Sequence, residues 1–268
     1  MFDYVATSAS PNPPLVLNTT DDGRKLVKYI PYATAVLFAL PATTEDLRRL
    51  HRAKYWSTLR RKERRFVEAH GPLRFRVITD ERELQAVLPL VQQLYRQRWR
   101  DEYTSLPWKT EEGFAPYREA MLDLASRGEA ELVVLESETD LLSFAYCIIQ
   151  GGTYYFYQHA TRTEGKYGEY SVGKLLVWKL ITHLVERAEF HTLDFMLGED
   201  DYKREWSTSS RTVYLRIAED ANLRGLVRYF VKRVYYPAKL YVQFRNPTLR
   251  RLAKRLLFVL QSQRDRGA

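Results

Sequence analysis

Cysteine is almost absent from this chain. Its 268 residues include one cysteine, Cys147, in a stretch predicted to form a strand. A single cysteine cannot pair within the chain, so the sequence excludes a disulfide-stabilised fold and is typical of a reducing compartment. The simplest interpretation of Cys147 is a small buried apolar residue.

Long apolar runs are absent as well. No run approaches the ~18 residues that a membrane-spanning helix needs, and residues 1–15 lack the basic and apolar regions of a signal peptide. We therefore expect a cytoplasmic protein.

Several common catalytic motifs are missing. The sequence has no His-Glu-x-x-His run, no Cys-x-x-Cys pair, no Gly-Lys-Ser/Thr phosphate loop and no Gly-x-Gly-x-x-Gly fingerprint. Metal sites and NTPase cores usually carry such spacings, so we expect neither a metal centre nor an NTPase.

The composition is that of a folded globular protein. With 45% hydrophobic and 13% aromatic residues, the chain can bury a sizeable core in one or two domains. The net charge of +9 is concentrated: residues 222–268 hold twelve Lys or Arg and one acid. A second cluster, residues 48–65, has nine bases and one acid. This second cluster fits a solvated basic helix or a surface for a phosphate-rich partner equally well.

The chain is organised around residues 141–206. Two runs rich in aromatic and β-branched residues, 141–150 and 153–159, are separated by Gly151 and Gly152. This pattern predicts a β-hairpin.

A helix is predicted after the hairpin, because apolar residues recur at helical spacing from Val177 to Ala188. Ser171 is a candidate N-cap, and Gly173 would let another molecule approach the backbone of the first turn. A helix N-terminus with Lys174 beside it suits a phosphate or pyrophosphate, although a serine and an early glycine are also ordinary helix punctuation.

The remaining elements alternate in type. We expect strands over 25–30, 33–40, 73–79, 130–136, 192–197 and 212–217, and helices over 84–99 and 117–125. Another helical segment should begin at a Thr44 cap and either form two helical pieces or bend around Ser57. Trp99 and Trp108 are core residues by default, with the wall of an acceptor site as the alternative.

Three motifs carry a family resemblance. They are Ser171-x-Gly173-Lys174-Leu175-Leu176, Leu193-Asp194-Phe195-x-x-Gly198 and Tyr202-Lys203-x-x-Trp206. Together they resemble the CelD-like branch of the GNAT acyltransferases, over roughly Ala42 to Ile217. The resemblance implies an α/β GNAT-like sandwich with a mixed, mostly antiparallel sheet. It also suggests an N-terminal remnant with a basic helix (1–70), an acyltransferase domain (71–220) and a basic amphipathic helical tail (221–268).

The resemblance implies a function and a donor. In this family a helix N-terminus receives the pyrophosphate of acyl-CoA. The corresponding segment here is Tyr170, Ser171, Val172, Gly173, Lys174 and Leu175. We therefore expect an N-acyltransferase that transfers an acyl group from acyl-CoA to an amine or amino sugar, in the synthesis of a glycan, lipid or related metabolite.

Acyl transfer to an amine needs a neutral amine, a polarised carbonyl and a proton for the leaving thiolate. Backbone N–H groups near Tyr146 are candidates for polarising the carbonyl. Asp194 or Glu199 could relay the proton of the amine, and Tyr170 or Tyr202 could protonate the thiolate.

Two further side chains have competing roles. Lys203 is a surface lysine, a donor to a cofactor phosphate, or a donor to the acceptor or the reacting carbonyl, and the resemblance favours the last two. His159 is a candidate base, although a lone histidine at a strand end is more often structural.

The basic C-terminal segment is compatible with several roles. Apolar stripes over 223–234 and 249–260, each with bases on the opposite face, predict two amphipathic helices. They could pack on the protein, bind an anionic membrane surface or bind RNA. The CelD-like group also resembles Fem-type peptidyltransferases, which use aminoacyl-tRNA. The alternatives are therefore a tRNA-dependent transferase, or a non-catalytic docking subunit of a membrane-associated polysaccharide assembly.

Overall fold

The computed structural model describes residues 4–6, 16–20, 23–100, 107–163, 165–198, 200–220 and 222–240. The chain divides into two compact units, one formed by Val36–Ser209 and the other by Met1–Ala35 with Ser210–Ala268. The division of the chain at residues 70 and 220 stays a prediction.

The unit Val36–Ser209 alternates strands and helices. Its elements are the end of β3 (Gly23–Ala39), α1 (Thr44–Arg49), α2 (Ala53–His70), β4 (Arg74–Ile78), α3 (Glu81–Arg98), the 3-10 helix η1 (Pro107–Lys109), α4 (Glu111–Ser126), β5 (Ala130–Glu136), β6 (Leu141–Gln150), β7 (Thr153–Thr161), the 3-10 helix η2 (Gly165–Tyr170), α5 (Val172–Arg187), β8 (Thr192–Leu197) and α6 (Asp201–Arg204).

The sheet of this unit is mixed and mostly antiparallel, as the sequence predicted. The strands lie in the order β3, β8, β7, β6, β5, β4. The pairs β4–β5, β5–β6 and β6–β7 are antiparallel, and β7–β8 is parallel. A crossover through α5 connects the parallel pair, because parallel neighbours cannot be joined by a tight turn.

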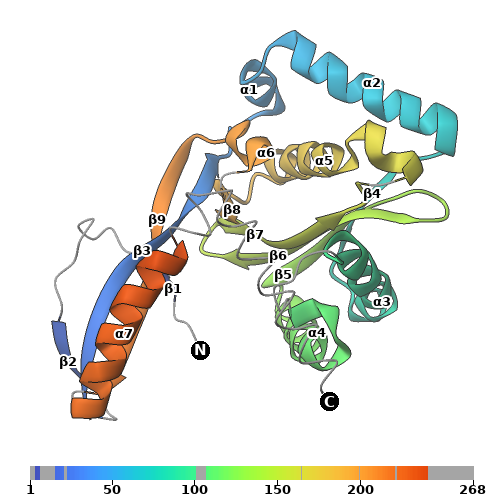
Figure 1. Ribbon diagram of the computed structural model, residues 1–268. Helices are drawn as coiled ribbons and strands as arrows, with labels where there is room; N and C mark the ends of the chain where they lie inside the picture. Colours follow the sequence, from blue (N-terminus) through green and yellow to red (C-terminus); the bar gives the residue numbers. More distant parts are fainter. Residues whose placement is uncertain are drawn as a thin grey trace. The chain divides into compact units, whose positions relative to one another are not determined.

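Helices cover both faces of this sheet. Helices α2 and α5 lie over one face, and α3 and α4 over the other (Figure 1). Successive residues of β5 enter different cores: Val133 packs toward α5, and Val134 packs toward α3 and α4. Burial on both faces explains why this strand reads as a continuous apolar run.

Several predicted boundaries are confirmed and others need correction. The strand over 141–150 and the helix after Ser171 are confirmed, and the second hairpin strand extends to Thr161. The N-cap of α1 is Thr43, not Thr44, because Thr43 Oγ1 accepts a hydrogen bond from the Asp46 N–H at 3.1 Å. The basic segment forms two helices, α1 and α2, which confirms the alternative of two helical pieces; the break lies at residues 50–52 and not around Ser57.

The predicted strands over 25–30 and 33–40 form one strand, β3. Pro31 lies within it. The fixed φ of proline is compatible with an extended chain. Because proline has no backbone N–H, it removes at most one hydrogen bond between strands.

The other unit contains β1 (Tyr4–Ala6), β2 (Val16–Thr20), the first part of β3, most of β9 (Ser209–Asp220) and α7 (Leu223–Leu240). Strand β1 pairs with β9, and β2 pairs with β3, both antiparallel. Helix α7 confirms the first of the two predicted tail helices. The second, over 249–260, lies outside the described residues. No helix among the described residues is both long and apolar enough to span a bilayer.

Candidate active site

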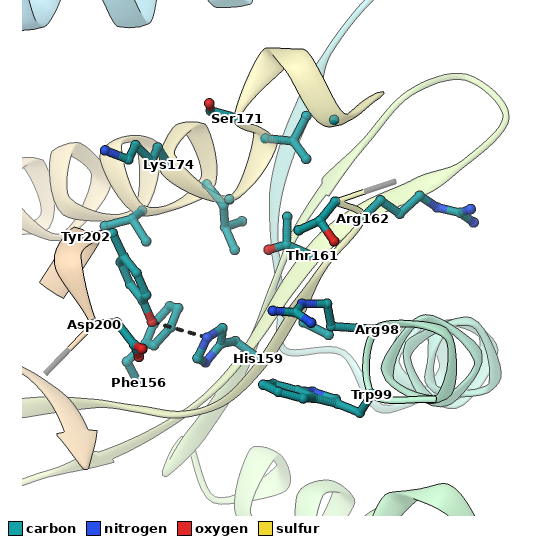
Figure 2. A pocket seen from close by; sticks show the side chains of 17 residues that line it. Arg98, Trp99, Phe156, His159, Thr161, Arg162, Ser171, Lys174, Asp200 and Tyr202 are labelled. Atoms are coloured by element: carbon teal, nitrogen blue, oxygen red, sulfur yellow. Dashed lines mark hydrogen bonds between the residues drawn. The ribbon is translucent and has the colours of Figure 1, made fainter. Parts of the chain in front are cut away.

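A cavity of about 420 Å³ lies in the unit Val36–Ser209. The end of α3, the second half of β7, the loop before α5, the first turns of α5 and the start of α6 form its wall (Figure 2). The lining residues are Arg98, Trp99, Phe156, His159, Ala160, Thr161, Arg162, Thr163, Gly168, Ser171, Val172, Gly173, Lys174, Leu176, Val177, Asp200 and Tyr202.

The cavity follows from a separation of two strands. The parallel pairing of β7 with β8 ends at Tyr155 and Asp194, although β7 continues to Thr161. The part of β7 beyond this pair supplies Phe156, His159 and Thr161 to the cavity wall. Because α3 and α5 lie on opposite faces of the sheet, the cavity is lined from both faces (Figure 1).

Strand β7 carries a bulge in the same region. Tyr146 of β6 pairs with Gln158, and the next residue, Cys147, pairs with Phe156. Tyr157 is therefore the extra residue on β7. A bulge interrupts the ladder of backbone hydrogen bonds and bends the strand.

The N-terminus of α5 is not capped in the usual way. Ser171 occupies the N-cap position, as the sequence predicted, but it has a left-handed φ of 52° and its hydroxyl makes no cap hydrogen bond. The first turn also contains no acidic residue. Instead, Lys62 of α2 donates a hydrogen bond to Ser171 Oγ. The positive end of the helix dipole therefore has no carboxylate of its own helix beside it.

Packing against Thr161 disfavours any side chain at Gly173. A Cβ built on Gly173 would lie 2.9 Å from Thr161 Oγ1 and 3.2 Å from Thr161 Cγ2. Thr161 Oγ1 is itself 2.7 Å from the hydroxyl of buried Ser143. The glycine thus allows the first turn of α5 to approach the end of β7.

Basic side chains surround the start of α5. Lys174 forms an ion pair with Glu205. Burial, and then the positive charge of Lys174, lowers the pKa of Lys62. On the loop that leads to α5, Arg162 donates to Leu141 O at 2.9 Å and lies 3.4 Å from a carboxylate oxygen of Asp140.

His159 and Tyr202 meet at the centre of the cavity. Tyr202 Oη lies 3.1 Å from His159 Nε2, and Figure 2 shows the two side chains directed toward each other from β7 and α6. Burial, with the charges of Lys203 and Arg98, lowers the pKa of His159 to about 3. Burial, with a smaller effect of Asp200, raises the pKa of Tyr202. At neutral pH the pair is therefore an uncharged imidazole and a protonated phenol.

The predicted site residues fall into two groups. Ser171, Val172, Gly173, Lys174 and Tyr202 line the cavity. The others do not line it, or lie outside the described residues; they are Tyr170, Leu175, Asp194, Lys203 and Glu199.

The buried members of the second group have packing or hydrogen-bonding roles. Asp194, 1% exposed, accepts a hydrogen bond from the Met196 N–H at 2.7 Å. Lys203, 3% exposed, donates to Leu197 O at 2.6 Å. Glu199 is the one predicted site residue outside the described residues. The hydrogen bonds of Asp194 and Lys203 hold the chain between β8 and α6, and α6 carries Tyr202.

Three residues that line the cavity are not identified as a site by any sequence motif. Arg98 and Trp99 come from the end of α3, and Arg162 follows β7. Trp99 was interpreted as a core residue, with an acceptor wall as the alternative. The available signal was a polar-rich stretch after each element, which is too common to identify a site.

No group of three or more His, Cys, Asp or Glu side chains suited to a metal ion occurs in the part of the chain that the structure describes.

Three solved structures illustrate the likeness of the fold. A conserved protein of unknown function from Bacteroides thetaiotaomicron is 12% identical, with a TM-score of 0.50, over 72% of this chain and 62% of its own. FemX is 11% identical, with a TM-score of 0.49, over 76% and 65%. The C-terminal DUF2156 domain of an Agrobacterium fabrum protein is 14% identical, with a TM-score of 0.48, over 76% and 65%. This chain thus spans less than two thirds of each of these chains.

No curated protein matches the sequence. The family model of the acetyltransferase (GNAT) domain matches residues 41–204, which is more than half of the chain. This match covers the sheet strands β4 to β8, helix α5 and the residues that line the cavity. The chain therefore belongs to the GNAT acetyltransferase family.

Proposed function

We propose that this GNAT protein transfers an acyl group from acyl-CoA to the nitrogen of an amine or amino sugar, at the cavity described above. Acyl-CoA is the donor that the GNAT family uses. The observation that carries the proposal is the meeting, in one cavity, of a helix N-terminus without a side-chain cap, the part of β7 beyond its pairing with β8, and the His159–Tyr202 pair.

The start of α5 would bind the pyrophosphate of the donor. The first backbone N–H groups of a helix lack i−4 partners, although here the Lys174 N–H donates to Ser171 O at 2.8 Å, and the helix dipole favours an anion at this end. Lys62 and Lys174 add positive charge, and no carboxylate occurs in the first turn. Tyr170 and Leu175 are both buried and would support this segment by packing in the core.

The acyl thioester would lie along the end of β7. The bulge at Tyr157 interrupts the ladder opposite Tyr146, so a backbone N–H in this region is suited to bind the carbonyl oxygen. That oxygen gains negative charge when the amine attacks, and a fixed donor stabilises the charge. Apolar side chains of Phe156 and Val177 line the same wall and suit an acyl chain.

The His159–Tyr202 pair would move the protons. The amine nitrogen forms a bond to the carbonyl carbon, the bond from that carbon to sulfur breaks, and the amine proton passes to His159 Nε2. Tyr202 gives its proton to the leaving thiolate. The 3.1 Å contact between Nε2 and Oη then lets the proton taken up by His159 replace the one that Tyr202 released.

Asp194 and Lys203 would act as positioning residues. Their hydrogen bonds to Met196 N and Leu197 O fix the end of β8, from which the chain continues to Tyr202. Glu199, which lies between them in sequence, remains a candidate relay for the amine proton.

Titration calorimetry with acetyl-CoA tests the donor site. The wild-type protein should bind acetyl-CoA, and Lys174→Gln should weaken binding about 10- to 100-fold, the value of a charge-assisted hydrogen bond. Lys179→Gln is the matched control: Lys179 lies on the same helix and pairs with Glu63, outside the cavity lining. Equal effects of the two substitutions, or no binding by the wild type, would contradict the proposal.

Two further arms separate the alternatives. Uncharged tRNA, titrated at two salt concentrations, tests the aminoacyl-tRNA-dependent reaction: binding of tRNA alone, with a steep loss at high salt, would favour it. Binding of neither ligand would favour a non-catalytic docking subunit.

A second role, docking on an anionic membrane surface, is favoured by α7. Its exposed apolar side chains recur at helical spacing, with Leu223 78%, Val227 57%, Phe230 52% and Val234 72% exposed. The helix contains five Lys or Arg and no acid. An apolar stripe on a basic helix is suited to the interface of a bilayer that contains anionic lipids.

Vesicle sedimentation tests this role. The full chain should sediment with vesicles that contain anionic lipid and much less with neutral ones, and added salt should release it. Val227→Asp with Val234→Asp should abolish sedimentation, while Leu90→Asp, at an exposed apolar position on α3, should not. Sedimentation that survives the α7 substitutions would exclude this helix as the docking surface.

A further inference from the structure

We infer that the acyl acceptor carries an anionic group, a carboxylate or a phosphate, in addition to its amine, and that Arg98 binds this group. The inference rests on the proposed function, because it concerns the second substrate of the same cavity. The supporting observation is which charged side chains of the cavity wall have a charged partner and which do not.

Most of the positive charge in the cavity already has a partner. Lys174 pairs with Glu205, and Arg162 pairs with Asp140 and with a backbone carbonyl. Arg98 differs: among the described residues no carboxylate pairs with it. Its guanidinium carbon lies 4.5 Å from the centre of the Trp99 ring. Arg98 is therefore a cation of the cavity wall whose hydrogen-bond donors remain available to a ligand.

Arg98 lies on the side of the cavity that the donor phosphates would not use. It ends α3, which covers the face of the sheet opposite to α5 (Figure 1). Figure 2 shows its guanidinium reaching past the end of β7 toward His159, with Ser171 and Lys174 on the far side of the cavity. The donor phosphates at the start of α5 and an anion at Arg98 would thus occupy separate ends of one cavity.

The geometry of Arg98 suits a carboxylate or a phosphate. A guanidinium presents a planar fork of N–H donors that matches two oxygens of either group. Stacking on the Trp99 ring restricts the side chain before the ligand binds, which lowers the entropy cost of binding.

The cavity also offers a partner for the amine of the same molecule. Asp200 is the one carboxylate among the described lining residues. One of its oxygens lies 3.7 Å from Lys203 Nζ, but its side chain is 63% exposed, so it would also attract an ammonium group before the amine is deprotonated. A cation at one place and a carboxylate at another favour an acceptor with both charges over a simple alkylamine.

Binding of the anion would also assist the chemistry. The charge of Arg98 is one of the causes that keep His159 unprotonated. An anion paired with Arg98 offsets that charge and makes the imidazole a stronger base when the acceptor is in place.

The test uses isotopically labelled acetyl-CoA and pairs of amines that differ only in the anionic group. Suitable pairs are α-amino acids with their carboxamides, and glucosamine 6-phosphate with glucosamine. The products are identified by mass spectrometry. For the pair with the fastest product, kcat/KM should be at least about 10-fold higher for the anionic member, the value expected of one charge-assisted contact.

Substitutions assign the preference to Arg98. Arg98→Ala should lower kcat/KM for the anionic member about 10- to 100-fold, should not lower it for the neutral member, and should leave the acetyl-CoA affinity nearly unchanged. Arg98→Glu should reverse the preference. Arg82→Ala, which removes the same charge from an exposed position at the start of α3, is the control and should change neither.

The outcomes separate this inference from the proposed function. If acetyl-CoA does not bind, the proposed function itself fails. If acetyl-CoA binds, the inference is overturned by any of three results: equal or better turnover of neutral amines, no product from any anionic amine, or a preference that survives Arg98→Ala. Weaker acetyl-CoA binding by Arg98→Ala would place Arg98 in the donor site and would also overturn the inference.

Discussion

The contact between Gly173 and Thr161 allows a quantitative prediction about how the donor site is built. Replacing Gly173 with alanine adds a Cβ that would meet Thr161 Oγ1 at 2.9 Å and Cγ2 at 3.2 Å. Thr161 cannot turn away without cost, because its hydroxyl is bonded to Ser143, which is 0% exposed. Gly173→Ala therefore forces an adjustment at the junction of β7 and α5.

Two opposing effects set the size of the change. Added bulk at a tightly packed position costs about 1–3 kcal/mol. Alanine is favoured over glycine within a helix by about 1 kcal/mol. Gly173→Ala should thus lower the free energy of unfolding by about 0–2 kcal/mol, the difference of these two effects.

The second substitution, Thr161→Ala, removes both close atoms and leaves the new Cβ at an ordinary distance. Ser143 keeps a partner, because its hydroxyl also donates to Ala160 O at 3.2 Å. In the Thr161→Ala background, Gly173→Ala should be neutral or stabilising. The coupling free energy between the two sites should be about 1–3 kcal/mol, equal to the packing cost that the second substitution relieves.

Urea denaturation of the wild type, both single variants and the double variant, followed by tryptophan fluorescence, measures this coupling. Additive effects, with a coupling below about 0.5 kcal/mol, would refute the packing argument, because additivity is typical of residues that do not touch. Packing against Thr161 would then not explain the glycine at position 173.

Three further predictions concern the site. Tyr202→Phe keeps the ring and removes only Oη, so kcat should fall about 100-fold or more, while the KM for acetyl-CoA and the free energy of unfolding stay near wild type; an unchanged kcat would remove Tyr202 from proton transfer. The pKa of His159 is lowered from 6.5 to about 3 in the folded state, so its neutral form stabilises the fold above pH 6.5 and this stability is lost as the pH falls from 6.5 toward 3. Relative to His159→Asn, the wild type should lose stability with a slope of up to about 1.4 kcal/mol per pH unit between pH 6 and pH 4.5, and parallel pH curves would contradict the pKa assignment. Lys62→Gln should weaken acetyl-CoA binding about 10-fold in calorimetry, whereas Arg64→Gln, at an exposed position of α2, should have no effect, and equal effects would show only a loss of general positive charge.

Much of the fold is visible in local patterns. The Gly151-Gly152 turn and the aromatic, β-branched strands around it predict the hairpin of β6 and β7, and the apolar spacing after Ser171 predicts α5. These features depend on residues close together in the sequence. The motif at the start of α5 then places that helix within a known family.

Contacts between distant segments were not visible in the sequence. Lys62 approaches Ser171 from a helix more than a hundred positions earlier, and Arg98 reaches the cavity from α3. In the sequence, each of these residues is one of several basic residues on the polar face of a helix. Only the packing of α2 and α3 on the sheet decides which of them faces the site. The cap of α1 illustrates a smaller limit: Thr43 and Thr44 are equally suitable types, and the Asp46 N–H selects Thr43.

The loss of pairing between β7 and β8 after Tyr155 has a consequence for how such a protein can diversify. The opening that results is bordered by α5 on one face of the sheet and by α3 on the other (Figure 1). Because these two helices belong to different cores, the end of α3 can be exchanged without disturbing the packing of α5. If Arg98 binds the acceptor as proposed, exchanging the segment around it for that of another chain of this fold would change the acceptor and leave the donor unchanged.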